Sequence, residues 1–355
     1  MSMQRRLLFV SHEMTLSGAP IQLAYLVVWL QERGWETTVV TPEPGPLAAK
    51  LPGIEIIYES QLLIDPAYGA LRRLIPQFDA VIANTVATWE AVQAAHLEKV
   101  PVVWYIHETR VGVYLMNKIH MIEPSLGLAD AIVTPTEATA RIYSGLTSTS
   151  LEVVPYGIPE VAAASAPGTA VLRFVVIGTY ERRKGQDIIV EALRQLSATA
   201  HGQACFRCAG RKLDEPFFEA LHTRSGALEN VELLGSLDHE AALHLLSQAD
   251  VLVCPSRDET MPIVLLEAMS LGKAIICTAV GGIEEWIRDG NNCLLVPSEN
   301  AAALAAAIEK LVADRGLVAR LGLAARETFQ RNFTIDRYGE EFARIIARTI
   351  ATATT

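Results

Sequence analysis

One short segment of the chain places two glutamates on either side of a predicted helix start. Glu259 lies in a loop after an apolar run, and Glu267 follows within the predicted helix. Pro262 suits the first turn of a helix, where its missing N–H group costs little. The free backbone N–H groups of that turn, near Ile263 and Val264, would bind an anion. The segment therefore predicts a phosphate site between two carboxylates that bind hydroxyl groups, as a nucleotide sugar requires.

Three consecutive cations follow another apolar run. Arg182, Arg183 and Lys184 come shortly after the predicted strand 172–178 and before a predicted helix. Taken alone, a solvent-exposed basic turn is an equally good interpretation. Their position favours function, because ligands bind at the carboxyl ends of the strands in doubly wound sheets. Cations there would bind a diphosphate and neutralise the charge that grows on it as it leaves.

Two residues in the first half of the chain lie at similar positions. His107 directly follows the predicted strand 102–106, and Gly18 lies between the first predicted strand and a helix. A glycine before a helix start lets the backbone approach a ligand closely. A lone histidine is usually structural and a lone glycine is usually a turn, so each signal is weak by itself.

Motifs of other nucleotide-binding enzymes are missing from the sequence. It contains no G-x-G-x-x-G dinucleotide fingerprint, which weakens an oxidoreductase, and no G-x-x-x-x-G-K-[ST] phosphate loop. It also lacks an aspartate-x-aspartate motif, so we expect no metal ion and no other cofactor at the site.

Apolar strand-like runs alternate with helical patterns along nearly the whole chain. Such runs are typical of parallel sheets buried on both faces, so the sequence predicts the α/β class. A length of 355 residues favours more than one core, and the Ala-, Pro-, Ser- and Gly-rich segment 159–169 is typical of a linker. We predict two doubly wound, Rossmann-like domains that face each other across a cleft. The expected domains are 1–160 and 168–336, and a helix within 337–355 is expected to pack back on the first.

Composition and charge argue against several classes of protein. The formal net charge of −10 argues against nucleic-acid binding. No apolar run reaches the roughly 18 residues of a membrane-spanning helix, and the first residues lead into a strand instead of a signal peptide. Cys205 and Cys208 form a C-x-x-C pair, but no second Cys or His pair at zinc spacing follows, and we expect a protein of the reducing cytoplasm.

Four motifs together resemble one large enzyme family. They are Glu259-x7-Glu267, Lys184-Gly185, Gly281-Gly282 and the turn Val154-Pro155-Tyr156-Gly157-Ile158. The set is similar to the retaining, nucleotide-sugar-dependent glycosyltransferases of family 4, which have the GT-B fold. The likeness covers nearly the whole chain and is densest from 178 to 297. It is specific to the family and not to one sugar.

The resemblance implies a role for each candidate residue. Glu267 would hold the ribose hydroxyls and Glu259 the hydroxyls of the donor sugar, while Arg183 and Lys184 would bind the diphosphate. His107 would orient the sugar near the reacting carbon. The catalytic candidates are thus His107, Arg183, Lys184 and Glu259. The other substrate-binding candidates are Gly18, Thr179, Arg211 and the backbone from Thr260 through Met261, Pro262 and Ile263 to Val264.

Three positions depart from the family pattern. Ser17 stands before Gly18 where the first loop of relatives usually has a second glycine. Thr179 stands where relatives often have an arginine, and Arg183 would replace that charge. Tyr156 stands where an asparagine is common in the turn. None of the three departures removes the positive charge that the resemblance assigns to the diphosphate site.

The implied reaction moves a hexosyl-type unit from a nucleoside diphosphate sugar to an acceptor hydroxyl, with retention of the anomeric configuration. The acceptor would be a glycan, a polysaccharide precursor or a lipid-linked sugar. Two alternatives stay open: a non-hydrolysing nucleotide-sugar epimerase and a non-catalytic nucleotide-sugar-binding subunit. Residues 110–122 are either an ordinary surface helix or a point of peripheral contact with the inner face of a membrane. The sequence does not predict an oligomeric state.

Overall fold

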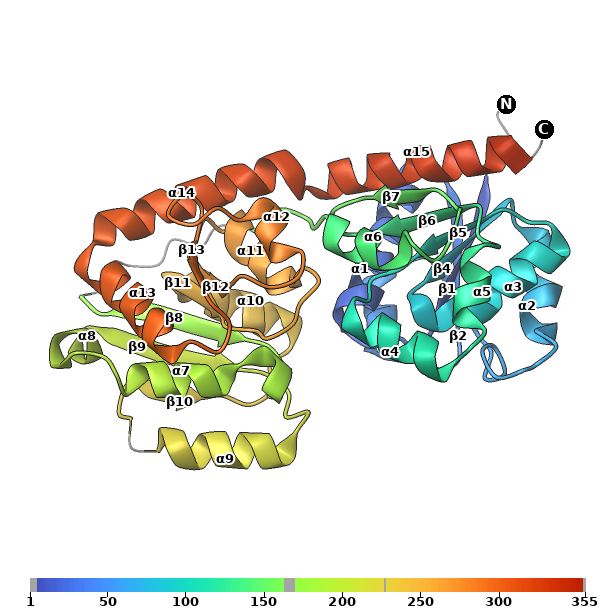
Figure 1. The fold of residues 1–355 in the computed structure, drawn as a ribbon. Helices are drawn as coiled ribbons and strands as arrows, with labels where there is room; N and C mark the ends of the chain where they lie inside the picture. The colour runs from blue at the N-terminus through green and yellow to red at the C-terminus, as the bar shows by residue number, and fades with distance from the viewer. Residues whose placement is uncertain (1–4, 163–169, 227, 354–355) are drawn as a thin grey trace. The chain divides into compact units, whose positions relative to one another are not determined.

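The computed structural model describes residues 5–162, 170–226 and 228–353, so most of the predicted linker, 163–169, lies outside the described residues. The chain divides into two compact units (Figure 1). Unit 1 comprises Met1–Pro159 and Phe333–Thr355, and unit 2 comprises Glu160–Asn332. Unit 2 is therefore one continuous segment, and unit 1 is built from two segments.

The sheet of unit 1 has seven strands in the order β3-β2-β1-β4-β5-β6-β7. All of its paired strands are parallel. The strands are β1 (Arg6–Ser11), β2 (Glu36–Thr41), β3 (Glu55–Tyr58), β4 (Ala80–Asn84), β5 (Val102–Tyr105), β6 (Ala131–Thr134) and β7 (Leu151–Val153). The α-helices are α1 (Gly18–Glu32), α2 (Gly69–Leu74), α3 (Trp89–Glu98), α4 (Arg110–Lys118), α5 (Ile122–Leu126), α6 (Glu137–Tyr143) and α15 (Ile335–Ala353).

Strand order and register bring three loops of unit 1 to one edge of its sheet. Strands are added in opposite directions from β1 and β4, so this pair is the switch point at which doubly wound sheets bind ligands. Ser11 of β1 lies opposite Asn84 of β4, which lies opposite Tyr105 of β5. The loops that follow these three strands therefore begin side by side.

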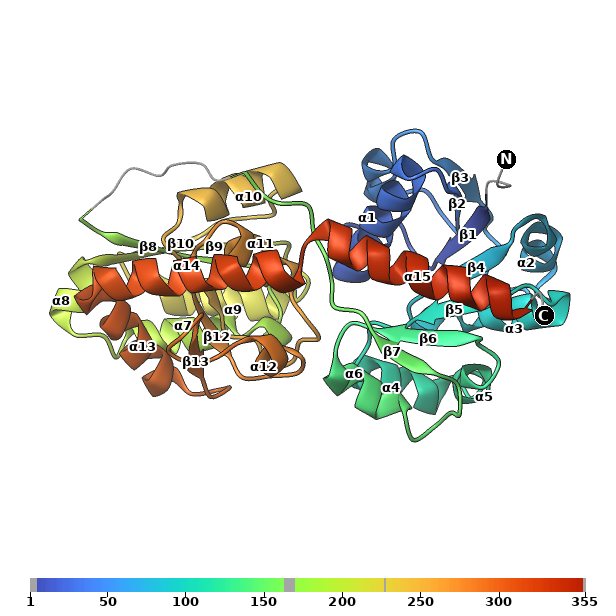
Figure 2. The ribbon, with the colours of Figure 1, turned by 90° about the horizontal axis from the view of Figure 1, so that it is seen from above.

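The last helix, α15, packs on α1 and β5 of unit 1, and Figure 2 shows it lying over the strands. A Cβ atom at Gly339 would lie 2.1 Å from the ring of Trp29, so only glycine allows this approach. The ring of Phe342 lies 4.7 Å from that of Tyr105, centroid to centroid. None of the described helices, α15 included, combines the length and the apolar character needed to cross a membrane.

The sheet of unit 2 has six strands in the order β10-β9-β8-β11-β12-β13, with its switch point between β8 and β11. All of its paired strands are parallel, so two doubly wound parallel sheets confirm the predicted fold class. The strands are β8 (Leu172–Ile177), β9 (Ala204–Ala209), β10 (Val231–Leu233), β11 (Val251–Cys254), β12 (Ala274–Thr278) and β13 (Leu294–Val296). The α-helices are α7 (Gln186–Leu193), α8 (Ala198–Gly202), α9 (Glu215–Ser225), α10 (His239–Gln248), α11 (Ile263–Ser270), α12 (Ile283–Trp286), α13 (Ala301–Ala313) and α14 (Arg315–Asn332).

Candidate functional site

The loops after β8 and β11, the two switch-point strands of unit 2, lie against each other. Gly185, at a φ of +71°, ends the 3₁₀ turn Arg182–Lys184 that follows β8. A Cβ atom on Gly185 would lie 2.1 Å from the carbonyl oxygen of Pro255, just after β11. A larger residue would force the two loops apart, so Gly185 permits the approach that brings Lys184 to Glu259.

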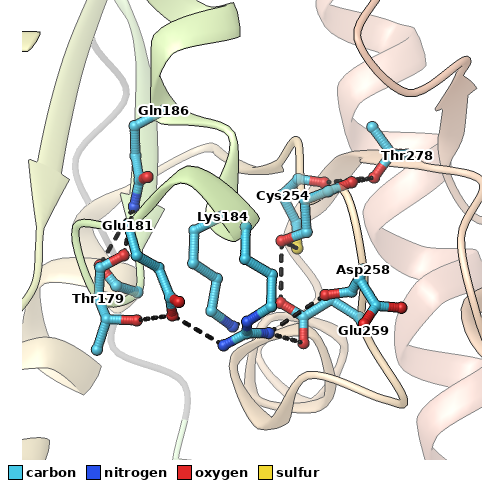
Figure 3. A network of polar contacts seen from close by, with 11 residues as sticks. Thr179, Glu181, Lys184, Gln186, Cys254, Asp258, Glu259 and Thr278 are labelled. Atoms are coloured by element: carbon cyan, nitrogen blue, oxygen red, sulfur yellow. Dashed lines mark hydrogen bonds and ion pairs between the residues drawn. The ribbon is translucent and has the colours of Figure 1, made fainter. Parts of the chain in front are cut away.

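Glu259 lies at the centre of a network of polar contacts (Figure 3). Its Oε1 lies 2.5 Å from Nζ of Lys184 and accepts a 2.9 Å hydrogen bond from Oγ of Ser256. Its Oε2 lies 3.5 Å from Nη1 of Arg183. The Glu259 side chain is 8% exposed, and a carboxylate this well buried is stable only when paired and hydrogen-bonded. The structure thus brings together three of the four catalytic candidates.

Arg183 is held by a second carboxylate that the sequence did not point to. Its Nη2 donates to Oε1 of Glu181 at 2.9 Å, and the hydroxyl of Thr179 donates to the same oxygen at 2.6 Å. Burial lowers the pKa of Arg183, but Glu259 and Glu181 outweigh that effect and raise it. The predicted substrate-binding residue Thr179 therefore uses its hydroxyl on Glu181, where it helps to fix the position of Arg183.

The loop after β12 supports Glu259 from its backbone side. Gly281 has a φ of +57°, and a Cβ atom there would lie 1.7 Å from the carbonyl oxygen of Glu259. The N–H group of Gly282 donates to the carbonyl oxygen of Thr260 at 3.1 Å. The two glycines of the predicted motif therefore pack directly on the Glu259–Thr260 backbone.

The helix α11 begins with Ile263, and Pro262 is its N-cap, one residue outside the helix. No side chain among the described residues caps this end, so the first N–H groups, including those of Ile263 and Val264, are not satisfied within the helix. Met261, just before the helix, is buried. The start of α11 has the free donors of an anion site, as predicted, although Pro262 lies before the first turn and not in it.

Glu267 contacts a histidine that was not among the predicted site residues. The Glu267 side chain is 9% exposed, and its Oε1 lies 2.7 Å from Nε2 of His239, the first residue of α10. Sequence reasoning missed His239, because its contact with α11 depends on the packing of two helices and not on a motif. Arg211 is exposed in the loop after β9, and within the described chain its side chain joins none of these contacts.

A cavity of about 430 Å³ lies at the opposite, amino ends of β8, β9 and β10. Arg173, Cys205 and Asn230 are among its lining residues. It contains none of the predicted site residues. A smaller depression lies among the loops at the carboxyl ends, and Lys184, Glu259, Pro262 and Val264 line it. We therefore place the candidate site at the smaller depression, where the charged groups converge.

In unit 1, His107 is buried and held on both sides of its ring. Oδ1 of Asn84 lies 2.8 Å from Nε2, and the hydroxyl of Tyr156 lies 2.8 Å from Nδ1. An amide oxygen only accepts, so Nε2 carries the proton and Nδ1 accepts from Tyr156. Burial, with a smaller contribution from His12, lowers the pKa of His107 to about 3. The ring is therefore neutral and suits orientation better than proton transfer. Gly18, the other unit 1 candidate, is exposed at the start of α1.

Thr85, which sequence reasoning missed, follows β4 at the same edge of the unit 1 sheet. Its φ of +79° and ψ of 160° fall in a region that is essentially restricted to glycine. Neighbouring groups hold it there. Its N–H donates to the carbonyl oxygen of Tyr105 at 2.8 Å, and its Oγ1 lies 3.1 Å from Nδ1 of His12. A β-branched residue after a strand predicts extended backbone, so no sequence signal could reveal this strain.

Comparisons with known proteins agree with this arrangement. The family model described as "Glycosyl transferases group 1" matches residues 149–328, and "Glycosyltransferase Family 4" matches residues 16–160. The structure of the Anabaena protein HepE in complex with UDP-glucose is similar, with a TM-score of 0.84 and 18% identity, over 98% of this chain and 100% of that one. At this identity the likeness shows a shared fold, and it supports the predicted GT-B architecture.

Curated relatives are similar over part of their length. A glycogen synthase of Mycobacterium tuberculosis is 27% identical over 259 residues, which cover 68% of this chain and 62% of the relative. The alpha-D-kanosaminyltransferase of Streptomyces kanamyceticus is 29% identical over 170 residues, covering 48% of this chain and 44% of that enzyme. The chain thus matches less than two thirds of each relative. Because the first family model matches about half of the chain, this protein belongs to the glycosyl transferases of group 1.

Proposed function

We propose that this protein transfers a sugar from a nucleoside diphosphate sugar to an acceptor hydroxyl, with retention of the anomeric configuration. The observation that carries the proposal is the convergence of Lys184 and Arg183 on Glu259 beside the uncapped start of α11. Two cations and free N–H groups fit a diphosphate. A buried carboxylate at the same place fits the hydroxyls of a sugar.

Donor binding would exchange the partners of these charged groups. Phosphate oxygens would become the counter-ions of Lys184 and Arg183, and the N–H groups of Ile263 and Val264 would add hydrogen bonds. Glu259 would then accept hydrogen bonds from the sugar, and Glu267 from the ribose. The backbone from Thr260 to Met261 would line the sugar, and Thr179 and Arg211 would lie at the margin of the donor.

Charge stabilisation would supply most of the rate. Breaking the bond between the sugar and the diphosphate leaves a cationic sugar and an anionic leaving group. Lys184 and Arg183 would stabilise the growing negative charge, and one such preorganised contact is worth about 3 kcal/mol. A phosphate oxygen of the leaving group would take the proton of the acceptor hydroxyl on the same face of the sugar, which gives retention. His107 and Gly18 belong to unit 1, and we propose that they orient the sugar and the diphosphate.

UDP-sugars are the first donors to test, because the similar HepE structure contains UDP-glucose. The reaction would take place in the cytoplasm, since the five cysteines are all free, as suits a reducing compartment. We expect a glycan or a lipid-linked acceptor.

The surface of α4 favours a lipid-linked acceptor at a membrane surface. Val111 and Tyr114 are 53% and 60% exposed, and Met121, just after the helix, is 43% exposed. Lys118 lies over the ring of Tyr114, with its Nζ 5.7 Å from the ring centroid. Apolar and basic side chains exposed on one element suit the boundary of an anionic lipid bilayer. Co-sedimentation with vesicles of phosphatidylglycerol, compared for the wild type and Tyr114→Glu, tests this contact.

A two-step experiment tests the proposed activity. Thermal shift with UDP-, GDP-, ADP- and dTDP-glucose identifies the donor, because a bound ligand raises the melting temperature. Incubation of the purified protein with that donor and a panel of glycan and lipid-linked acceptors, followed by NMR of the product, then reports transfer and anomeric configuration. Conversion of the donor into an epimeric nucleotide sugar without an acceptor would establish an epimerase. Donor binding without transfer by the protein alone would indicate a binding subunit.

A further inference from the structure

We propose that His239 is a positioning residue that fixes the Glu267 carboxylate, so that the protein distinguishes ribose from deoxyribose in a nucleoside diphosphate. The inference rests on the proposed function, because it assigns Glu267 to the ribose. His239 lies outside the sequence motifs, and the part of the ligand on which it would act is the ribose.

The start of α10 holds His239 in one place. Asp238 is the N-cap of this helix, and its carboxylate accepts a 2.8 Å hydrogen bond from the N–H group of Ala241. This cap fixes the first turn and therefore the position from which the His239 side chain extends. The imidazole reaches α11, where Nε2 lies 2.7 Å from Oε1 of Glu267. Since a carboxylate accepts, Nε2 donates.

This hydrogen bond engages one oxygen of the Glu267 carboxylate. Within the described chain, His239 is the polar partner that we find for the Glu267 carboxylate. One oxygen accepts from His239, and the second keeps its capacity to accept. A long side chain with one oxygen held loses little further rotational freedom when a ligand binds, so its interaction with a hydroxyl is stronger. Without His239, Glu267 would have to be ordered by the ligand itself.

Ribose has a 2′-hydroxyl that deoxyribose lacks. A carboxylate held in place accepts a hydrogen bond from this group, and a buried acceptor left without a partner carries a penalty. The fixed Glu267 should therefore favour ribose, and the preference should decrease when the carboxylate is free to rotate. His239 thus acts on selectivity and not only on affinity, which separates positioning from general support of the fold.

The test measures binding of UDP and 2′-deoxy-UDP by calorimetry. We expect the wild type to bind UDP about tenfold more tightly, the size of one hydrogen bond to a charged group. In His239→Ala this ratio should fall to about twofold or less, because a mobile carboxylate forms a weaker bond. His239→Gln, whose amide can donate to Glu267, should recover most of the ratio. His244→Ala, an exposed histidine on the same helix, should leave it unchanged.

Two outcomes separate this inference from the proposed function. An unchanged ratio in His239→Ala, with tight UDP binding, would overturn the role of His239 and leave the proposed function intact. If the protein binds a different base, the matched ribose and deoxyribose diphosphates of that base replace the UDP pair. Failure of the wild type to bind UDP, GDP, ADP or dTDP would overturn both proposals. His239→Asn, polar but too short to reach Glu267, serves the same comparison if the alanine variant does not fold.

Discussion

The two units present different chemistry at equivalent places. Each has a doubly wound parallel sheet whose switch-point loops carry polar side chains. In unit 2 these groups are charged, with Lys184 and Arg183 on Glu259. In unit 1 the buried polar cluster at this place is neutral, with His107 between Asn84 and Tyr156. One architecture therefore positions ion pairs in one unit and a neutral hydrogen-bonded cluster in the other, and the charged edge is the one that suits a diphosphate.

The largest effect should come from removing Lys184, one of the two cations that pair with Glu259 at the sheet edge of unit 2. In Lys184→Ala, we expect the turnover rate with the donor and acceptor found by screening to fall by roughly 10² to 10³, the loss that follows removal of one preorganised donor to a developing anion. Steady-state kinetics measures the change. Lys310→Ala, an exposed lysine of α13, is the matched control. Wild-type turnover in Lys184→Ala would show that the charged edge is structural.

Glu259→Gln separates the two roles of the central carboxylate. The variant should bind the nucleotide-sugar donor found by screening about tenfold or more weakly, because a sugar hydroxyl loses its charged acceptor. The nucleoside diphosphate of that donor should bind at least as well as it does to the wild type, since Lys184 and Arg183 lose a competing counter-ion. Calorimetry with both ligands checks this opposite response, and Glu327→Gln on α14 is the control. Parallel losses for both ligands would mean that Glu259 only supports the loop.

The neutral edge should make unit 1 sensitive to acid. Native His107 stays neutral to about pH 3, but an unfolded histidine binds a proton near pH 6.5. The unfolded state therefore binds more protons between these values. Stability then falls as the pH falls through this window, by up to about 1.4 kcal/mol per pH unit. Urea unfolding of His107→Gln should show a weaker decline than the wild type.

Comparing the wild type with His107→Gln at each pH isolates the contribution of His107 to the stability. Burial raises the pKa values of Glu90 and Glu108 to about 7, and these groups act in the opposite direction between pH 4.5 and 7. Both are present in the wild type and the variant. Identical pH dependence of the two proteins would contradict a neutral, buried His107.

The smallest effect concerns Thr85, the strained residue at the sheet edge of unit 1. Thr85→Gly should be more stable than Thr85→Ala by about 1 kcal/mol, because only glycine adopts its backbone angles without strain. At an ordinary position the order is reversed, since glycine loses more conformational freedom on folding. Thermal unfolding of both variants measures the difference in stability. If Thr85→Ala were the more stable of the two, Thr85 would not be strained.

Sequence reasoning predicted those features that depend on local pattern. Apolar runs predicted buried parallel strands, and the positions of Lys184 and Glu259 after two such runs predicted that they would share a sheet edge. Contacts that depend on tertiary packing were out of reach. The bond between His239 and Glu267 requires α10 and α11 to pack together, and the enclosure of His107 requires the turn at Tyr156 to return to β5. Neither contact corresponds to a fixed spacing of residues along the sequence.

The discontinuous construction of unit 1 has a consequence during synthesis. Unit 2 is encoded in one stretch, so its core can close once residue 332 has left the ribosome. The earlier part of unit 1 must wait, because Tyr105 and Trp29 pack against α15, which is made after unit 2. Until then an aromatic surface stays uncovered while a neighbouring unit folds. Translation therefore completes the second-made unit first, and the nascent first unit is the one that chaperones should recognise.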